Sequence, residues 1–378
     1  MQHGRSGRLH PVVARARRAV GRTVSTLEGT AGEPPLVLVG CSGGADSLAL
    51  AAATLYLQRR GTLRVGAVVV DHQLQEGSAD VARETAATLR AMGADPVLVE
   101  RVSVSRERHG PEMAARLARY GAFARAVQDT GAAAVLLGHT RDDQAETVLL
   151  GLTRGSGTRS LAGMSEHHVL DGVTYLRPFL WLTRAETETV CAAEGLDPWW
   201  DPTNRDTSLT RSRIRHEVLP YLDAQLGPGV AKALARTASV LGADADYLDE
   251  QAELALHAAL VTPGEPGPTR SAAAAASSSV VLDSAAVQGT PPALRRRVLA
   301  RACVLAGGET PSFERLTALE DFALGHGAAG PVQMAGKVAA WRHRPDAAHA
   351  RGCLELRGGS RTVTHETTPT QNNPGSAQ

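Results

Sequence analysis

The sequence predicts an α/β fold: a parallel sheet with helices on both faces, then a helical linker and a small α-rich C-terminal domain. Short apolar and β-branched runs alternate with helical stretches along the first half of the chain, which is typical of parallel sheets because each crossover uses a helix. Ligands of such sheets bind beyond the carboxyl ends of the strands. The loops after residues 40, 70 and 138 are therefore the candidate functional segments.

Each predicted element has its own local signal. The expected strands are the short apolar runs at 36–40, 65–70, 97–99 and 135–138. The expected helices between them are at 47–60, 78–92, 142–153 and from Pro111 to Gly131. Thr183 and Glu186 have the spacing of a capping box, which predicts one more helix that ends near Gly195.

Shifts in composition divide the chain into segments. We expect a basic N-terminal segment at 1–30, the α/β domain at 31–222, a helical linker at 223–262 and a low-complexity linker at 263–279. A small domain should cover 280–357. The polar residues 358–378 should form a disordered tail.

The composition excludes several classes of protein. The 40 basic and 39 acidic residues nearly cancel, so any nucleic-acid surface must be local. The four cysteines lie far apart, which disfavours zinc, iron–sulfur and disulfide frameworks. No apolar run approaches ~18 residues and the arginine-rich N-terminus lacks a following apolar stretch, so we expect a cytoplasmic protein without a membrane partner.

A Gly- and Ser-rich loop follows the first predicted strand, with the sequence Ser42-Gly43-Gly44-Ala45-Asp46-Ser47. Its glycines let the backbone approach an anion closely, the next helix offers free N–H groups, and both serine hydroxyls could add donors. Asp46 suits an anion only when a cation lies between them, which indicates a magnesium-bridged polyphosphate. An ordinary glycine turn is the alternative, and the loop matches neither a Walker A nor a dinucleotide motif.

Two further polar segments end the second and fourth predicted strands. Asp71, with the histidine after it, could contact a nucleoside or a metal, or it could cap the strand-end turn. After residue 138, the side chains of His139, Asp143 and Glu146 share one helix face, and Asp142 pairs with Glu146 at a spacing of four. Clustered carboxylates repel one another unless they bind a cation or an ammonium group. Helix-dipole capping explains Asp142 and Asp143, but not His139 together with Glu146.

Arginines near these segments could bind phosphate groups bidentately. The candidates are Arg116 and Arg119 on one helical face, Arg154 and Arg159 around the loop RGSGTR, and Arg211 and Arg215 in the helical region. For any single arginine, a solvated helix face is the simpler interpretation.

Taken together, these motifs resemble those of the tRNA(Ile)-lysidine synthetases, which are PP-loop ATP pyrophosphatases. SGGADS is similar to the PP-loop, and over residues 36–222 it is followed by VDH, AARLARY, GHTRDDQAET, LTRGSGTRSLAGM, LRPFL and DPTNRDTSLTRSRIRHEVLP. Ser212 departs from the pattern, because the family usually has Asn there. We expect no room before the tail for the second C-terminal domain that longer members have.

The resemblance implies the reaction and its participants. ATP adenylates the C2 oxygen of the wobble cytidine in a tRNA(Ile) with a CAU anticodon, and pyrophosphate leaves. The ε-amine of free L-lysine then attacks C2 and expels AMP. The lysidine formed changes codon reading from AUG to AUA. Residues 280–357 would contact the tRNA, and we also consider a homodimer.

The resemblance also implies roles for the candidate residues. ATP would bind at Ser42, Gly43, Gly44, Ala45, Asp46, Ser47 and Asp71, and Mg²⁺ at Asp46 and Asp143. The catalytic set would be Asp46, His139, Asp143, Glu146 and Arg211, with the general base left open among His139, Asp143 and Glu146. The substrates would meet Arg116, Arg119, Asp142, Arg154, Arg159 and Arg215.

Two other functions share parts of this pattern. A thiolating PP-loop tRNA enzyme needs paired cysteines near the site, and Cys191 has no neighbour in the sequence. A non-catalytic tRNA-binding protein would not need the polar residues of the loop and the acidic helix intact. Release of AMP and pyrophosphate that depends on tRNA and lysine distinguishes the synthetase from both.

Overall fold

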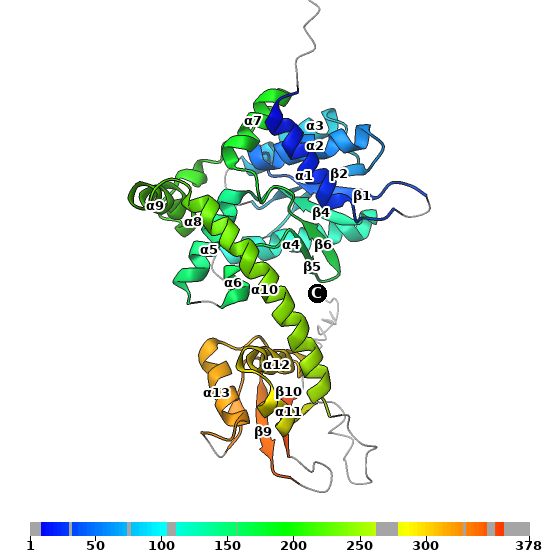
Figure 1. Cartoon of the computed structure of the whole chain (residues 1–378). Helices are drawn as coiled ribbons and strands as arrows, with labels where there is room; N and C mark the ends of the chain where they lie inside the picture. Colours follow the sequence, from blue (N-terminus) through cyan, green and yellow to red (C-terminus); the bar gives the residue numbers. More distant parts are fainter. Residues whose placement is uncertain are drawn as a thin grey trace, which may run out of the picture. The chain divides into compact units, whose positions relative to one another are not determined.

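The computed structural model describes residues 9–29, 32–73, 77–103, 111–155, 157–261, 279–327, 330–345 and 352–358. The chain divides into two compact units, Met1–Ala243 and Asp244–Gln378 (Figure 1). Each unit has a hydrophobic core of its own. None of the helices in the described ranges is long and apolar enough to cross a membrane.

Six strands form the sheet of the first unit, in the order β3-β2-β1-β4-β6-β5. They are β1 Leu36–Gly40, β2 Arg64–Asp71, β3 Val97–Arg101, β4 Ala134–Leu137, β5 His167–Leu170 and β6 Val173–Leu176. All neighbours pair in parallel except β5 and β6, an antiparallel hairpin that the sequence did not predict. The four predicted strands are confirmed as β1 to β4. The order of strands runs outward in one direction from β1 to β3 and in the other from β4 to β5, so the carboxyl ends of β1 and β4 form the topological switch point.

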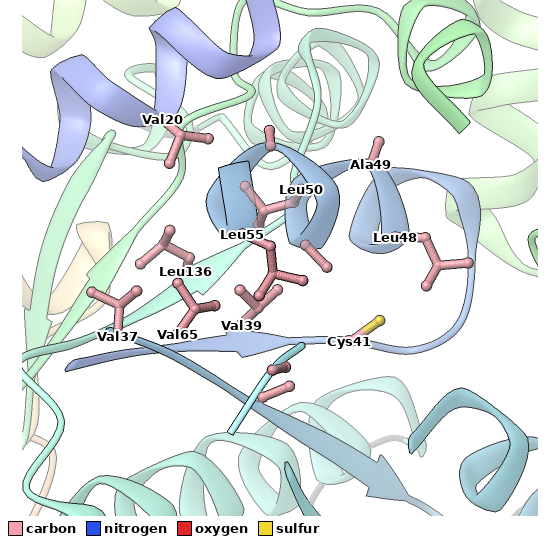
Figure 2. Packing of buried hydrophobic residues seen from close by; sticks show 14 of the residues in the cluster. Val20, Val37, Val39, Cys41, Leu48, Ala49, Leu50, Leu55, Val65 and Leu136 are labelled. Carbon is pink, nitrogen blue, oxygen red and sulfur yellow. The ribbon is translucent and has the colours of Figure 1, made fainter. Parts of the chain in front are cut away.

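Helices cover both faces of this sheet. The helices of this part of the chain are α1 Pro11–Val24, α2 Ala45–Arg59, α3 Ser78–Ala91, α4 Pro111–Thr130, α5 Arg141–Thr153, α6 Thr158–Leu161 and α7 Arg184–Glu194, and α5 and α6 pack against each other. In β1, Val37 and Val39 pack into the core formed with α1, α2, α3 and α7, while Leu36 and Leu38 pack into a second core with α4. Successive side chains of a strand point to opposite faces, so β1 is buried from both sides. Figure 2 shows Leu50 and Leu55 of α2 on the side of β1 to which Val37 and Val39 point, and full burial of such a leucine stabilises the fold by about 1.5–3 kcal/mol.

α1 lies within residues 1–30, which we expected to form a separate basic segment. Val13 and Val20 of α1 are buried in the main core of the first unit. Arg17 of α1 pairs with Glu194 of α7 at 2.8 Å. This part of the N-terminal segment is therefore built into the α/β unit, because its apolar side covers α2 and α7.

The chain after α7 forms short helical turns and then a long helix. These elements are η1 Pro202–Arg205, α8 Thr210–Arg213, η2 Ile214–Val218, α9 Leu219–Leu226 and α10 Val230–Ala259. η2 is a π-helical turn, a local rearrangement that is frequent at functional sites. α10 falls in the region predicted as a helical linker.

The second unit combines helices with an antiparallel sheet. Its elements are β7 Ser279–Asp283, α11 Ser284–Gly289, α12 Pro292–Leu305, α13 Phe313–Ala323, β8 Val332–Gln333, β9 Val338–His343 and β10 Cys353–Gly358. The sheet order is β7-β10-β9-β8, so β7 and β8 extend the β9–β10 pair on either side. The predicted low-complexity linker at 263–279 and the predicted tail at 358–378 lie outside the described residues, apart from Ser279 and Gly358.

Candidate functional site

The carboxyl edge of the first sheet opens into a cavity of about 390 Å³. Ser42 and Asp46 line it from the glycine-rich loop and the start of α2, and His139 and Asp143 line it from the end of β4 and from α5. The loop and the acidic helix therefore face one shared space, as the positions of the motifs predicted.

Gly43 and Ser47 fix the shape of the loop. Gly43 has a φ of +83°, and a Cβ atom there would lie 2.5 Å from Thr85 Oγ1, so the position requires glycine. The Ser47 hydroxyl accepts from the Ser42 backbone N–H at 3.2 Å and donates to the Gly44 carbonyl at 2.9 Å. Ser47 thus holds the loop together from inside and also lines the cavity, so its role as a phosphate donor stays a prediction. α2 begins after Gly44 with no side-chain cap among the described residues, which leaves N–H groups of its first turn for an anion.

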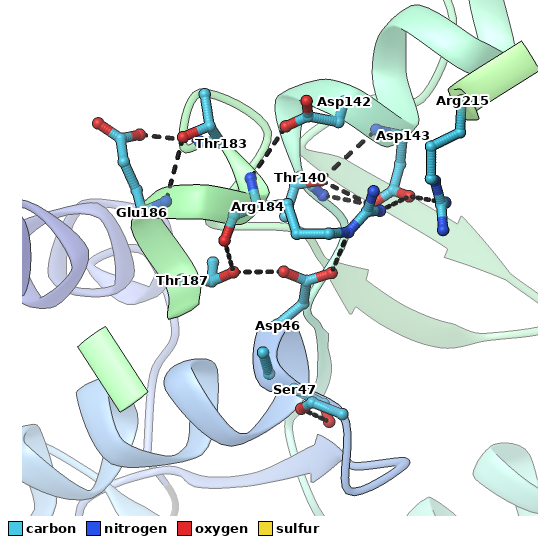
Figure 3. Close-up of polar contacts among 12 residues, drawn as sticks. Asp46, Ser47, Thr140, Asp142, Asp143, Thr183, Arg184, Glu186, Thr187 and Arg215 are labelled. Atoms are coloured by element: carbon cyan, nitrogen blue, oxygen red, sulfur yellow. Dashed lines mark hydrogen bonds and ion pairs between the residues drawn. The ribbon is translucent and has the colours of Figure 1, made fainter. Parts of the chain in front are cut away.

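Arg184, the first residue of α7, joins the two acidic segments (Figure 3). Its Nε atom lies 3.4 Å from Asp46 Oδ2 and its Nη2 atom lies 3.0 Å from Asp143 Oδ1. Thr187, one turn further along α7, donates to the other oxygen of Asp46. Gly138 makes the approach possible at the end of β4, because a Cβ atom there would lie 2.9 Å from the Asp46 carbonyl carbon.

Burial and arginine act in opposite directions on these two carboxyl groups. Burial raises the pKa of Asp46 to about 6, although Arg184 favours its charged form. Burial also acts to raise the pKa of Asp143, but Arg184 and the hydrogen bonds from Thr140 outweigh it, so this pKa is lowered. Thr140 and Asp143 form the capping box of α5, in which the Thr140 backbone N–H donates to Asp143 Oδ2 at 2.7 Å. Asp143 is therefore a fixed, charged group at the cavity wall.

Glu146 forms a buried ion pair and is not among the described residues that line the cavity. Its side chain is 1% exposed, and Arg215 donates from Nε to Oε1 at 2.7 Å and from Nη2 to Oε2 at 3.2 Å. Arg215 comes from the π-helical turn η2 and also reaches Asp143 Oδ1 at 3.4 Å. Burial raises the pKa of Glu146 even though Arg215 counteracts the shift. Glu146 thus positions Arg215, which does line the cavity, beside Asp143.

Two histidines, His72 and His139, line the cavity with an Nδ1 atom that has no hydrogen-bond partner in the described part of the chain. Burial lowers the pKa of His139 to about 3. Burial and the charge of Arg119 lower the pKa of His72. Both imidazoles are therefore neutral near physiological pH and can hydrogen-bond a ligand without adding charge.

Two predicted acidic contacts serve the protein backbone instead. Asp71 accepts from the Gln73 backbone N–H at 3.0 Å and from Ser78 Oγ at 2.8 Å, which is the strand-end cap that the sequence also allowed. Asp142 accepts from the Arg184 backbone N–H at 2.9 Å and so ties the start of α7 to α5. Neither side chain is among the described residues that line the cavity.

The six predicted arginines are divided by the fold. Arg119 and Arg215 line the cavity. Arg116 lies 5.0 Å from the centre of the Tyr120 ring, and Arg211 lies 4.0 Å from Glu146 Oε2. The side chains of Arg154 and Arg159 are exposed. Neither Arg154 nor Arg159 is among the described residues that line the cavity.

Sequence reasoning missed Arg184 and Glu188 of α7 and Trp199, Trp200 and Asn204, all of which line the cavity. The available signal was the capping box, which sets the start of α7 and hence the place of Arg184. The Trp199 backbone N–H donates to the Gly43 carbonyl at 3.0 Å, so this segment is fixed to the loop. Ser212, the departure from the expected Asn, is buried and donates to the Asn204 carbonyl at 2.9 Å.

In a comparison with known proteins, two parts of the chain match the models of domain families. Residues 19–222 match the model of a PP-loop domain, and residues 282–347 match that of a TilS substrate binding domain. The chain is 51% identical over 298 residues to the tRNA(Ile)-lysidine synthase of Thermobifida fusca (strain YX), covering 79% of this chain and 84% of that protein. It is 46% identical over 325 residues to the protein of that name from Leifsonia xyli subsp. xyli (strain CTCB07), covering 85% and 86%. With the one from Streptomyces coelicolor (strain ATCC BAA-471 / A3(2) / M145), identity is 43% over 357 residues, covering 88% and 96%.

Proposed function

The chain belongs to the tRNA(Ile)-lysidine synthase family, and from that premise we propose that its cavity binds ATP and L-lysine side by side while tRNA(Ile) presents a cytidine to both. It is an enzyme of this kind, with a PP-loop domain that uses ATP. The observation that carries the proposal is the cavity shared by Ser42, Asp46, His139 and Asp143. A reaction in two steps on one base is fastest when nucleotide and amino acid are held within reach of it together.

In the first step, the C2 oxygen of the wobble cytidine attacks the α-phosphate of ATP. A new oxygen–phosphorus bond forms, the bond to the β-phosphate breaks, and pyrophosphate leaves. Gly43, Gly44 and the first-turn N–H groups of α2 would hold the departing pyrophosphate. Arg119 and Arg215, which line the cavity, would steady the α-phosphate or the tRNA backbone.

The site has a donor set that fits Mg²⁺. Asp46 Oδ2 and Asp143 Oδ1 already converge on one cation, the Arg184 guanidinium. Protein Mg²⁺ sites commonly use one or two carboxylates together with substrate phosphates. No group of three or more acidic, histidine or cysteine side chains that could hold a metal ion is found among the described residues, so phosphates and water would supply the other ligands. When bound, Mg²⁺ would neutralise the charge of the polyphosphate.

In the second step, the ε-amine of lysine attacks C2 of the adenylated base. A carbon–nitrogen bond forms, the C2–oxygen bond breaks, and AMP leaves with that oxygen. The attacking amine must lose a proton, and a base has to be within reach of it. His139 and Asp143 line the cavity and Glu146 is not among the residues that do, so we assign the base to His139 or Asp143. Glu188, another cavity carboxylate, would hold an ammonium group of lysine.

The thiolating alternative conflicts with the environment of the thiols. Cys41 adjoins the loop and Cys191 lies on α7, and both are buried. Burial raises the pKa of Cys41, and it raises that of Cys191 to about 12. Sulfur transfer needs a thiolate, which these surroundings oppose.

The test is incubation of the protein with labelled L-lysine, ATP and unmodified tRNA(Ile) bearing a CAU anticodon, followed by nucleoside analysis. We expect lysidine, with one AMP and one pyrophosphate released for each lysine incorporated. Arg125→Met is the matched control, because it removes a single exposed ion pair with Glu100 outside the cavity and should leave turnover unchanged. Release of ADP, or release of AMP when lysine is left out, would contradict the proposal.

A further inference from the structure

Arg184 lies between the two carboxylates that the proposed function assigns to Mg²⁺. The Nε atom is 3.4 Å from Asp46 and the Nη2 atom is 3.0 Å from Asp143. The side chain is 25% exposed and lines the cavity, so it is accessible to a ligand there. Its main chain is fixed, since its N–H group donates to Asp142 at 2.9 Å and Thr183 caps the helix before it.

The charges around this position explain why a cation is needed. Asp46 and Asp143 bind the same guanidinium, and two such carboxylates repel each other when nothing separates them. Arg215 also contacts Asp143, but at 3.4 Å, and its shorter contact of 2.7 Å is with the buried Glu146. Arg184 is thus the cation that Asp46 and Asp143 share (Figure 3).

We propose that Arg184 is a positioning residue that holds Asp46 and Asp143 together in the free enzyme and releases them to Mg²⁺ when ATP binds. This inference rests on the proposed magnesium site. The guanidinium and the metal would use the same carboxylate oxygens, so they compete for them. ATP favours the exchange because its phosphates offer the released guanidinium a bidentate partner. Mg²⁺ should therefore enter with ATP and bind poorly alone.

The test compares the wild-type enzyme with Arg184→Met and Arg184→Lys. Calorimetric titration with MgCl₂ alone, without nucleotide, measures metal binding directly. Arg184→Met should bind Mg²⁺ about tenfold more tightly than wild type, because the competing charge is gone. Arg184→Lys should give an intermediate affinity, since an ammonium group keeps the charge but cannot span both carboxylates as a planar guanidinium does. Arg125→Met should match wild type.

Thermal unfolding gives a second readout. In EDTA, Arg184→Met should unfold at a lower temperature than wild type, because Asp46 and Asp143 lose their shared cation. Addition of Mg²⁺ should raise the unfolding temperature of Arg184→Met by more than it raises that of Arg125→Met. An affinity for Mg²⁺ alone that is the same in all variants would overturn the inference. If Arg184→Met does not fold, Arg184→Lys carries the same comparison.

The outcomes separate this inference from the proposed function. If wild type forms lysidine while the variants show unchanged Mg²⁺ affinity, the role of Arg184 is wrong and the function stands. If wild type binds no Mg²⁺ even with ATP present, the magnesium site is wrong. If no lysidine forms at all, the reaction is wrong whatever the metal titration shows.

Discussion

Replacing Arg215 by Met should destabilise the first unit by about 3–5 kcal/mol, because Glu146 would remain buried without its counter-ion. The Glu146 side chain is 1% exposed and accepts two hydrogen bonds from Arg215, at 2.7 and 3.2 Å. Arg211 lies 4.0 Å away, too far to replace them. Removal of the whole guanidinium therefore leaves a charge in a site from which water is largely excluded.

A double-mutant cycle with Glu146→Gln measures how much of this cost belongs to the pair. Glu146→Gln alone should cost less, about 1–3 kcal/mol, because the Arg215 side chain left behind is 22% exposed and keeps its contact with Asp143. The double variant should cost less than the sum of the two single changes, with an interaction energy of about 1–3 kcal/mol.

The assay is urea unfolding followed by tryptophan fluorescence in a Trp341→Phe background. Trp181, Trp199 and Trp200 belong to the first unit and Trp341 lies on β9 of the second, so this background reports the first unit alone. Additive costs, or a loss below about 1 kcal/mol for Arg215→Met, would refute the assignment of Glu146 as the partner of a buried pair.

Three further predictions follow from individual contacts. Asp143→Asn should abolish pyrophosphate release while tRNA binding by filter assay stays within twofold or so of wild type, and normal turnover would contradict its role. Gly43→Ala should raise the KM for ATP and lower stability by about 1–2 kcal/mol, because the position has a φ of +83° and the new Cβ would lie 2.5 Å from Thr85 Oγ1; adding Thr85→Ala should recover part of the loss, and a neutral Gly43→Ala would count against the loop geometry. Glu355 has its pKa lowered to about 2, since hydrogen bonds from Arg357 and Ser279 outweigh the effect of burial, so Glu355→Gln should cost the second unit at most about 3 kcal/mol at neutral pH. Because the pKa of Glu355 is lower in the folded than in the unfolded state, its charged form stabilises the fold above the unfolded pKa, and this stability is lost as pH falls. The difference in free energy of unfolding between wild type and Glu355→Gln should therefore shrink between about pH 4.5 and 2. A difference that stays constant with pH in urea unfolding would contradict this.

Local chemistry made much of the first unit predictable. The alternation of β-branched runs with helical stretches identified β1 to β4, and Thr183 with Glu186 identified the start of α7. Gly43 and Gly44 marked the loop, and Gly43 is required there because its φ is +83° and a Cβ atom would lie 2.5 Å from Thr85 Oγ1 of α3. These signals lie within a few residues of the element that they specify, so no tertiary information was needed to interpret them.

Contacts between distant residues could not be predicted in the same way. Arg184 meets Asp46 across 138 positions of sequence, and nothing in the neighbourhood of either residue specifies the other. α1 was not predicted, because its arginines were interpreted as a basic segment, although Val13 and Val20 share a buried side. The π-helical turn that aims Arg215 at Glu146 is a backbone rearrangement for which hydrophobic periodicity gives no signal.

The acidic helix face shows why counting carboxylates is a poor guide to catalysis. By spacing, Asp143 and Glu146 lie on the same predicted helix face as His139, and each is a candidate base. In the fold, Glu146 is 1% exposed and bound to Arg215, whereas Asp143 is 15% exposed and lines the cavity. A base must meet the proton that it removes, so burial separates the two carboxylates more sharply than charge does. His139 can also meet that proton, because burial keeps its imidazole uncharged at the cavity wall and its Nδ1 atom has no hydrogen bond to the described residues. Both groups stay unprotonated across the neutral range, because burial lowers the pKa of His139 to about 3 and Arg184 lowers that of Asp143, so pH does not distinguish them as bases. His139→Gln should therefore reduce the rate of lysine attack without changing its pH profile, and a changed profile would contradict this assignment.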